Sequence, residues 1–376
     1  MSQRCLVIRC DASFLIGSGH VMRCRTLAHE LLRRGVKVIF LCRRQPGDLI
    51  KSLAQEFTVL ELPELQRSTI SKSCDEPLQS RKLYSSWLGC SQKQDAADCL
   101  RALAEAGIRT FSWLVVDHYG LDADWEAQML SGCVGDFLPR FFVIDDLADR
   151  HHQTDFLLDQ GFYGAITETR YKGLVPDQCR QLLGPQYALL GPEYAQLHTL
   201  LPSRTELRRV FVFFGGVDLS NHTSKALEAL LDPELADLAV DVVLGFQCPH
   251  RQVVEKSVKR RPYTTLHNPQ PSLAGLMSRA DLAIGAGGAT TWERACLGLP
   301  SLVVAIAENQ LPMATVLNET SQITLLGFSS DVGVKEMRQA LLCALRYPDR
   351  WPRLSGKNLT DGQGVFRISD LLFQIQ

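Results

Sequence analysis

The sequence predicts an α/β protein with two domains, each built on a parallel β-sheet covered by helices. Short apolar runs alternate with amphipathic segments of about ten to fifteen residues, which is typical of βαβ units. This pattern occurs twice, and the 376 residues suit two domains of ordinary size. We place the boundary so that residues 1–203 form the first domain and residues 204–376, with a C-terminal helix, the second.

The predicted strands are nearly continuous apolar runs, as expected when helices cover both faces of a sheet. They are residues 5–10, 37–42, 58–62, 113–118, 141–146 and 156–160 in the first domain, and 210–216, 240–245, 264–268, 281–288, 301–307 and 323–328 in the second. Helical spacing of apolar residues marks 21–34, 95–107, 223–231, 272–280, 290–298 and 333–345. The polar stretch 63–94 fits neither pattern, and loops of that length are usually functional lids or mobile segments.

The composition excludes several functional classes. Hydrophobic residues make up 45% of the chain, and a net charge of −1 creates no general positive field for nucleic acid or anionic lipid. The 12 cysteines contain no C-x-x-C pair or zinc-site spacing, which favours a reducing compartment. The first residues have the pattern of a strand rather than a signal peptide, and no apolar run approaches the ~20 residues that span a bilayer. We therefore expect a cytoplasmic protein without membrane insertion.

Ligands of open α/β sheets bind outside the carboxyl ends of the strands, and the first strand here is followed by a suggestive turn. Asp11 leads into Gly17 and Gly19 and then into a helix that begins near His20. Glycines allow close approach to a ligand, and the positive end of a helix favours a neutral imidazole, which can accept a proton. The alternative is that His20 only caps or packs the helix.

Two more strands of the first domain end in polar residues. Asp117 and Tyr119 follow one of them and are site candidates, although an Asp in this place also often caps a turn. Asp145 and Asp146 follow the next strand and are placed to hold a sugar hydroxyl, a water or Arg150.

The strongest motif lies in the second domain, where a glycine-rich loop leads into a helix. Backbone amides and two hydroxyls of this loop suit a diphosphate, and an acidic residue in the following helix suits a ribose. The residues are Gly287, Gly288, Ala289, Thr290, Thr291 and Glu293. The spacing differs from the G-x-G-x-x-G of dinucleotide-binding dehydrogenases and from a P-loop, so both classes are disfavoured.

Two further motifs of the second domain are open to more than one interpretation. Gly215 and Gly216 follow its first strand and suit equally a backbone nest for phosphate or a tight turn. Glu308, Asn309 and Gln310 follow another strand and are candidates for hydrogen bonds to a sugar or base, with a helix cap as the alternative for Asn309.

Taken together, these motifs resemble those of the UDP-sugar hydrolases of pseudaminic acid biosynthesis, which release UDP from UDP-2,4-diacetamido-2,4,6-trideoxy-β-L-altropyranose. The matching segments include IGSGHVMRC, WLGCSQKQDA, VVDHYGLD, FGGVD, GAGGATTWERACLGLP, AENQ and DGQG, and the match runs from Arg9 to Arg367. That family is similar to the glycosyltransferase B enzymes. The resemblance therefore implies two Rossmann-like domains with parallel sheets that face a cleft.

The resemblance also implies roles for individual residues. His20 would orient or deprotonate the attacking water, and Tyr119 would assist at the sugar. The glycine-rich loop would lie at the diphosphate, Glu293 at the ribose, and Asn309 and Gln310 near the nucleotide or sugar. Cys10 and the GPEY segment at 191–194 depart from the family pattern, which affects details on the sugar side more than the reaction.

We expect hydrolysis with inversion, a small-molecule UDP-sugar as the partner, no cofactor, and no metal, because no D-x-D motif accompanies the loop. A transferase of the same fold and a nucleotide-sugar-binding protein without catalysis are the alternatives. The sequence leaves the oligomeric state open.

Overall fold

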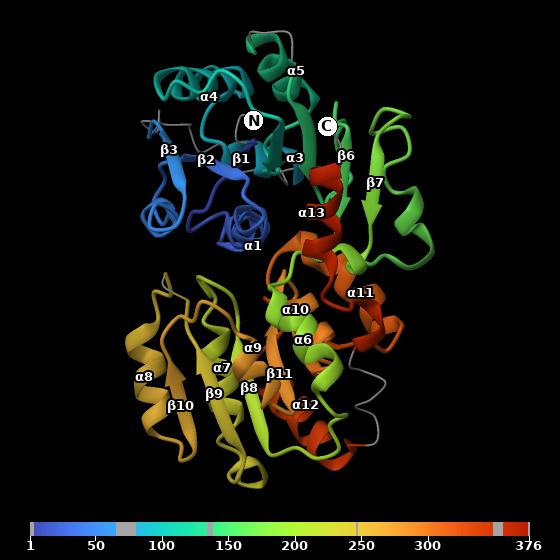
Figure 1. Cartoon of the computed structure of the whole chain (residues 1–376). Helices are drawn as coiled ribbons and strands as arrows, with labels where there is room; N and C mark the ends of the chain where they lie inside the picture. The colour runs from blue at the N-terminus through green and yellow to red at the C-terminus, as the bar shows by residue number, and fades with distance from the viewer. Residues whose placement is uncertain (1–3, 65–79, 134–137, 246, 349–355, 375–376) are drawn as a thin grey trace. The chain divides into compact units, whose positions relative to one another are not determined.

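The computed structural model describes residues 4–64, 80–133, 138–245, 247–348 and 356–374. The chain forms two compact units, each with one parallel sheet (Figure 1). The first unit comprises Met1–Gln160, Ile166–Leu183 and Phe366–Gln376, and the second comprises Gly161–Ala165 and Gly184–Val365. The predicted α/β class with two parallel sheets is confirmed.

The sheet of the first unit has seven strands in the order β3-β2-β1-β4-β5-β6-β7, and all neighbours are parallel. The strands are β1 (Cys5–Cys10), β2 (Lys37–Arg43), β3 (Thr58–Leu62), β4 (Trp113–Asp117), β5 (Arg140–Ile144), β6 (Phe156–Asp159) and β7 (Arg180–Leu183). The strand order reverses between β1 and β4. In such sheets the carboxyl ends of the two strands at the reversal flank the binding crevice.

The sheet of the second unit repeats this plan with six parallel strands in the order β10-β9-β8-β11-β12-β13. The strands are β8 (Arg209–Phe213), β9 (Ala239–Val243), β10 (Thr264–His267), β11 (Leu282–Ala286), β12 (Ser301–Ala305) and β13 (Thr324–Phe328). Here the order reverses between β8 and β11. Each unit thus has its own switch point. The predicted motifs at Asp11, Asp117, Gly215 and Gly287 follow the strands on either side of it, and the others follow the next strand, β5 or β12.

Helices pack against both faces of each sheet. Because successive strand residues point to opposite faces, the side chains on both faces are buried. Those of the first unit are α1 (Gly19–Arg33), α2 (Ile50–Leu53), α3 (Ser80–Trp87), α4 (Gln92–Glu105), α5 (Ala123–Gly132) and most of α13 (Gly364–Gln374). Those of the second are α6 (Pro192–Leu200), α7 (His222–Ala229), α8 (Arg251–Lys259), α9 (Ala274–Ser278), α10 (Thr290–Cys296), α11 (Leu311–Glu319) and α12 (Val334–Arg346). Short 3₁₀ turns complete the chain at Gly164–Thr169, Pro185–Tyr187, Pro233–Leu235, Glu308–Gln310 and Lys357–Leu359.

The unit boundary differs from the one expected at residues 203 and 204. Helix α6 belongs to the second unit, where Tyr194 lies in the core and Nδ1 of His198 is 2.7 Å from the carbonyl oxygen of Cys296. The chain end belongs to the first unit, since Trp113 Nε1 donates to the carbonyl oxygen of Leu372 at 3.2 Å. These contacts join residues far apart in the chain, so a boundary drawn from the start of a strand missed them.

Two local expectations also need correction. Strand β7 was not predicted, because its sequence RQLL is short and half polar. The stretch 63–94 is not one irregular loop: Ser80–Trp87 forms α3, and α4 begins at Gln92. The part of the expected lid at 65–79 lies outside the described residues.

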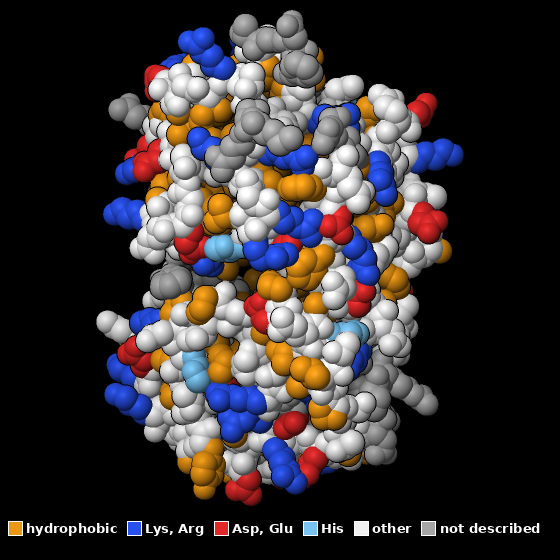
Figure 2. Space-filling model, viewed as in Figure 1, with side chains coloured by type: hydrophobic (Ala, Val, Ile, Leu, Met, Phe, Trp, Pro, Cys, Tyr) orange, Lys and Arg blue, Asp and Glu red, His pale blue; other side chains and the backbone are white. Residues whose placement is uncertain are grey.

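The charge balance of the sequence is visible on the surface. Figure 2 shows Lys and Arg side chains interspersed with Asp and Glu over the face in view. Within the described part of the chain, no helix is long and apolar enough to cross a bilayer.

Candidate functional site

The turn after β1 places His20 in the first turn of α1. Gly17 closes this turn with φ +78°, a conformation that favours glycine, and its amide donates to the carbonyl oxygen of Ser13 at 2.8 Å. Helix α1 then begins at Gly19, so the expected helix start near His20 is confirmed. Because α1 follows β1 at the switch point, the imidazole is directed toward the neighbouring strand β4.

His20 is paired with Asp117, the last residue of β4. Nδ1 of the imidazole lies 2.6 Å from Oδ1 of Asp117, whose side chain is fully buried, and His20 itself is 6% exposed. A carboxylate oxygen accepts hydrogen bonds, so this contact assigns the imidazole proton to Nδ1. Nε2 then carries the lone pair.

Arg23 completes this group from the next turn of α1. Its Nε and Nη2 donate to the two oxygens of Asp117, both at 2.7 Å, and its Nη1 donates to Oδ2 of Asp146 at 3.0 Å. Burial opposes ionisation of Asp117, but Arg23 and His20 outweigh it and hold the pKa of the carboxyl well below its usual range. Asp117 is therefore a permanent anion behind the imidazole.

Tyr119 lies beside the imidazole and is tied to the same group. Its hydroxyl donates to Asp146, and its ring lies edge-on to the ring of His20 with centroids 4.5 Å apart. Burial raises the pKa of Tyr119 well above its ordinary value, so the hydroxyl remains a proton donor. Trp87, which is half-buried, stacks on Tyr119 with ring centroids 5.6 Å apart. The structure thus brings together His20, Tyr119 and Asp117, which the sequence predicts as site candidates in two separate motifs.

Asp11 is fully buried and contacts other side chains of the protein. Both of its oxygens accept from Arg9, at 2.5 and 2.8 Å, and Oδ1 also accepts from the amide of Arg43. Arg9 and Arg43 in turn pair with Asp95, and all four side chains are buried. This arrangement gives Asp11 the role of fixing the ends of β1 and β2.

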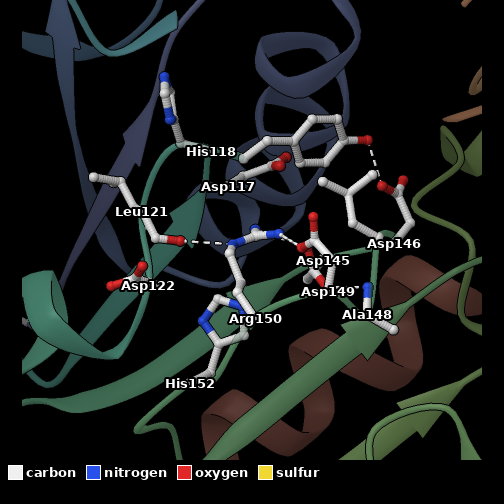
Figure 3. A network of polar contacts seen from close by, with 12 residues as sticks. Asp117, His118, Leu121, Asp122, Asp145, Asp146, Ala148, Asp149, Arg150 and His152 are labelled. Carbon is white, nitrogen blue, oxygen red and sulfur yellow. Dashed lines mark hydrogen bonds and ion pairs between the residues drawn. The ribbon is translucent and has the colours of Figure 1, made fainter. Parts of the chain in front are cut away.

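The acidic segment after β5 divides between two roles. Asp145 is fully buried and pairs with Arg150 at 2.7 Å, while Nε of Arg150 donates to the carbonyl oxygen of Leu121 at 2.8 Å (Figure 3). Asp149 pairs with the same guanidinium at 2.9 Å. Asp146 points away from this pair toward Tyr119 and Arg23. Of Asp145 and Asp146, the two predicted site candidates, only Asp146 belongs to the group around His20.

In the second unit the glycine-rich loop follows β11. The amide of Gly287 donates to the carbonyl oxygen of Val304 and so extends the sheet, whereas Gly288 is half-buried and Ala289 exposed. Thr290 and Thr291 open α10, and their hydroxyl oxygens accept from Arg294 at 3.0 and 3.2 Å. The accessible polar groups of the loop therefore lie between residues 288 and 290.

Glu293 and Gln310 flank this loop. Burial raises the pKa of Glu293 to about 7, against the opposing influence of Tyr194 and Arg294. Gln310 lies close to Gly287, as a Cβ added at that glycine would come 3.4 Å from Oε1 of Gln310. The same oxygen accepts from the amide of Ile306 at 3.0 Å. Glu308 and Asn309 occupy the same 3₁₀ turn, with Glu308 exposed and Asn309 half-buried.

The motif after β8 forms the tight strand-to-helix turn that was one of its two interpretations. Gly215 has φ +90°. The carbonyl oxygen of Gly216 packs against Gly245 so closely that a Cβ added at Gly245 would come 2.0 Å from this oxygen. Asp218 then caps α7 by accepting from the amides of His222 and Thr223 at 2.8 and 2.9 Å. A phosphate nest at Gly215 and Gly216 stays a prediction.

Sequence reasoning missed two cations that the structure places under the candidate groups. Arg23 is three residues after His20, and Arg294 is four after Thr290, so each pair shares one helix face. That spacing was a usable signal. Over the described ranges, no group of three or more His, Cys, Asp or Glu side chains is arranged as a metal site.

Solved structures with the same architecture include enzymes named for nucleotide sugars. A UDP-glucosyltransferase from Polygonum tinctorium superposes with a TM-score of 0.64 at 14% identity, covering all of both chains. The chain has the fold of the glycosyltransferase B enzymes. The UDP-GlcNAc 2-epimerase from Neisseria meningitidis, solved with UDP-GlcNAc bound, superposes with a TM-score of 0.60 at 12% identity, covering 99% of this chain and all of the other.

Curated relatives are similar at the level of sequence, and no protein-family model matches the chain. The chain is 24% identical over 83% of its length to the UDP-2,4-diacetamido-2,4,6-trideoxy-beta-L-altropyranose hydrolase of Campylobacter jejuni, 95% of which is covered. It is 29% identical over 56% of its length to the spore coat polysaccharide biosynthesis protein SpsG of Bacillus subtilis. The match to SpsG spans 62% of that protein, and a separate match to an uncharacterized protein of Methanocaldococcus jannaschii spans 56% of that one. The chain thus covers less than two thirds of each of these two relatives. The resemblance seen in the motifs is thereby confirmed.

Proposed function

We propose that this protein is a UDP-sugar hydrolase that converts UDP-2,4-diacetamido-2,4,6-trideoxy-β-L-altropyranose and water to UDP and the free sugar. The observation that carries the proposal is the 2.6 Å contact of His20 Nδ1 with the buried carboxylate of Asp117, which leaves Nε2 as a base. The relative of that name in Campylobacter jejuni supports the choice of substrate.

In the proposed reaction, Nε2 of His20 accepts a proton from a water molecule as the water oxygen attacks the anomeric carbon. The bond between that carbon and the diphosphate oxygen breaks, and UDP leaves with the electron pair. Attack on the face opposite UDP inverts the configuration. Asp117 then stabilises the imidazolium, as a buried carboxylate at Nδ1 does in hydrolases that use a His base.

The second unit is proposed to hold UDP. The diphosphate would lie at Gly287, Gly288, Ala289, Thr290 and Thr291, with Glu293 at the ribose and Glu308, Asn309 and Gln310 near the nucleotide or sugar. UDP is a good leaving group, so catalysis requires stabilisation of the negative charge that grows on the diphosphate more than a strong acid. Hydroxyls and amides of the loop suit that need. Tyr119, Gly17 and Gly19 would complete the sugar side, with Asp11 fixing the end of the strand that leads to the two glycines.

The test is incubation of the protein with the UDP-sugar in ¹⁸O-labelled water without any acceptor. We expect steady release of UDP over many turnovers, with ¹⁸O in the sugar product and none in UDP, and we expect the rate to survive EDTA. Label in UDP would contradict attack at carbon. Turnover only after an acceptor is added would identify a transferase, and UDP binding without turnover would identify a binding protein.

A further inference from the structure

A buried arginine lies under the glycine-rich loop of the second unit. Arg294 is on α10, and its side chain is 1% exposed. Its Nη2 donates to the carbonyl oxygen of Ala286 at 2.8 Å, at the end of β11. Room for the guanidinium depends on Gly285, since a Cβ there would come 3.0 Å from Nη1. The arginine is thus built into the base of the loop.

In the described part of the chain, Arg294 makes no close ion pair, in contrast to the buried Arg9 and Arg43. Arg9 and Arg43, which are equally buried, each contact two aspartates within 3.0 Å. Within the described ranges, no carboxylate oxygen lies within 4.0 Å of the Arg294 guanidinium, although the neighbouring carboxyl of Glu293 raises its pKa against the effect of burial. The buried Nε of Arg294 has no hydrogen-bond partner among the described residues. Burial lowers its pKa to about 10, which still leaves it charged at neutral pH. Because buried charges are normally paired, this position favours a negative ligand nearby.

The two hydroxyls above the guanidinium are oriented by it. Thr290 Oγ1 accepts from Nη1 at 3.0 Å and Thr291 Oγ1 accepts from Nη2 at 3.2 Å. A hydroxyl has one proton to donate, and an accepted hydrogen bond occupies a lone pair and turns the O–H away from the donor. A donor that is itself polarised by a cation forms stronger hydrogen bonds to an anion.

We propose that Arg294 is a positioning residue that directs the hydroxyl of Thr290 toward the diphosphate of the bound nucleotide and supplies the positive charge behind it, while the buried Thr291 holds the guanidinium in place. The inference rests on the proposed function and deepens it. It predicts that the contribution of Arg294 to binding depends on the negative charge of the ligand rather than on the nucleoside.

The test is calorimetric titration of the full-length protein and its Arg294→Gln variant with UDP, UMP and uridine. We expect Arg294→Gln to weaken UDP binding about 10- to 100-fold and UMP binding less, with uridine binding unchanged. Arg279→Gln is the matched control, because Arg279 on the same unit is half-exposed and its partner Asp241 keeps its contacts with Arg209 and His267. This control should bind all three ligands normally. Equal losses for UDP and uridine would overturn the inference.

A second pair of variants keeps the test decisive if Arg294→Gln does not fold. Thr290→Val removes the hydroxyl and Thr290→Ser retains it, so only Thr290→Val should weaken UDP binding, with uridine binding unaffected. Normal UDP binding by Thr290→Val overturns the proposal. A failure of the proposed hydrolysis would be seen in a different measurement: the wild-type protein would bind UDP but would not release UDP from the UDP-sugar. In that case the comparison of UDP, UMP and uridine binding still decides the role of Arg294.

Discussion

The two units place their candidate groups at equivalent positions, after the strands at the switch point of each sheet, but they use different chemical groups there. In the first, side chains at the ends of β1 and β4 are fixed by ion pairs, with Arg23 between the carboxylates of Asp117 and Asp146. In the second, the groups after β11 are loop amides and hydroxyls, and Arg294 donates to two of these hydroxyls and to the carbonyl oxygen of Ala286.

The difference teaches that each unit has the charge that its proposed role requires. Around His20, two carboxylates face one guanidinium, so the group has a negative excess that stabilises an imidazolium. Under the glycine-rich loop a guanidinium lies among hydroxyl and carbonyl oxygens, which favours an anionic ligand. One unit is thus prepared to take up a proton and the other to hold a leaving anion. The following predictions test that contrast.

The largest effect is expected from His20→Ala, which removes the proposed base and leaves the second unit unchanged. Turnover should fall by about 10²–10⁴-fold while the Kd for UDP stays nearly constant, as measured by UDP release and calorimetry. His29→Ala is the matched control, because His29 is on the same helix and also pairs with a carboxylate, Glu56, at 2.7 Å. Full turnover by His20→Ala would remove His20 from the mechanism.

Asp95→Asn tests the ionic support beneath the first unit. Asp95 is fully buried and accepts from Arg9, Arg43 and Trp125, and the two arginines overcome burial to hold its pKa well below its usual range. Loss of this charge leaves two guanidiniums undercompensated, so urea unfolding should show a loss of about 3–5 kcal/mol. The same change at the exposed Asp124 should cost little. A loss of similar size in both variants would contradict the role of the buried network.

Asp117→Asn separates orientation of the imidazole from its chemistry. The amide no longer supplies a full negative charge to Nδ1 of His20, so turnover should fall by about 10–100-fold, less than in His20→Ala. Glu56→Gln provides the comparison, since Glu56 likewise joins an arginine and a histidine of α1. UDP binding should be unaffected in both variants. A rate for Asp117→Asn equal to wild type would show that the pair is only structural.

The smallest effect concerns the pH dependence of stability at Glu293. Burial raises the pKa of this carboxyl to about 7, whereas an unfolded Glu titrates near its ordinary value. The folded state therefore binds more protons between these values, and the wild-type protein should lose stability as pH rises through that window. Glu293→Gln removes the titration, so its stability relative to wild type should rise by about 1–2 kcal/mol between about pH 5.5 and 7. Glu228→Gln, at an exposed site, should show no such trend; a constant difference for Glu293→Gln would contradict the shifted pKa.

The sequence was informative wherever the evidence is local. Apolar runs located the strands around both switch points, and glycines marked the turn before His20 and the loop after β11. It was less informative about Asp11, whose position after a strand is the same as that of a ligand-binding residue. Only its contacts with Arg9 and Arg43 reveal a structural role, and those partners come from two different strands.

The chain by itself determined the two α/β units, the helix starts and the residues that follow each strand, because side-chain periodicity and turn chemistry act over a few neighbouring residues. Tertiary structure alone decided the partners: Asp117 meets His20 across 97 residues, and Asp95 meets Arg9 across 86. The order of strands in a sheet brings such residues together. Whether a buried charge is paired, as at Arg23, or left facing a loop, as at Arg294, depends on that order and on the packing around it.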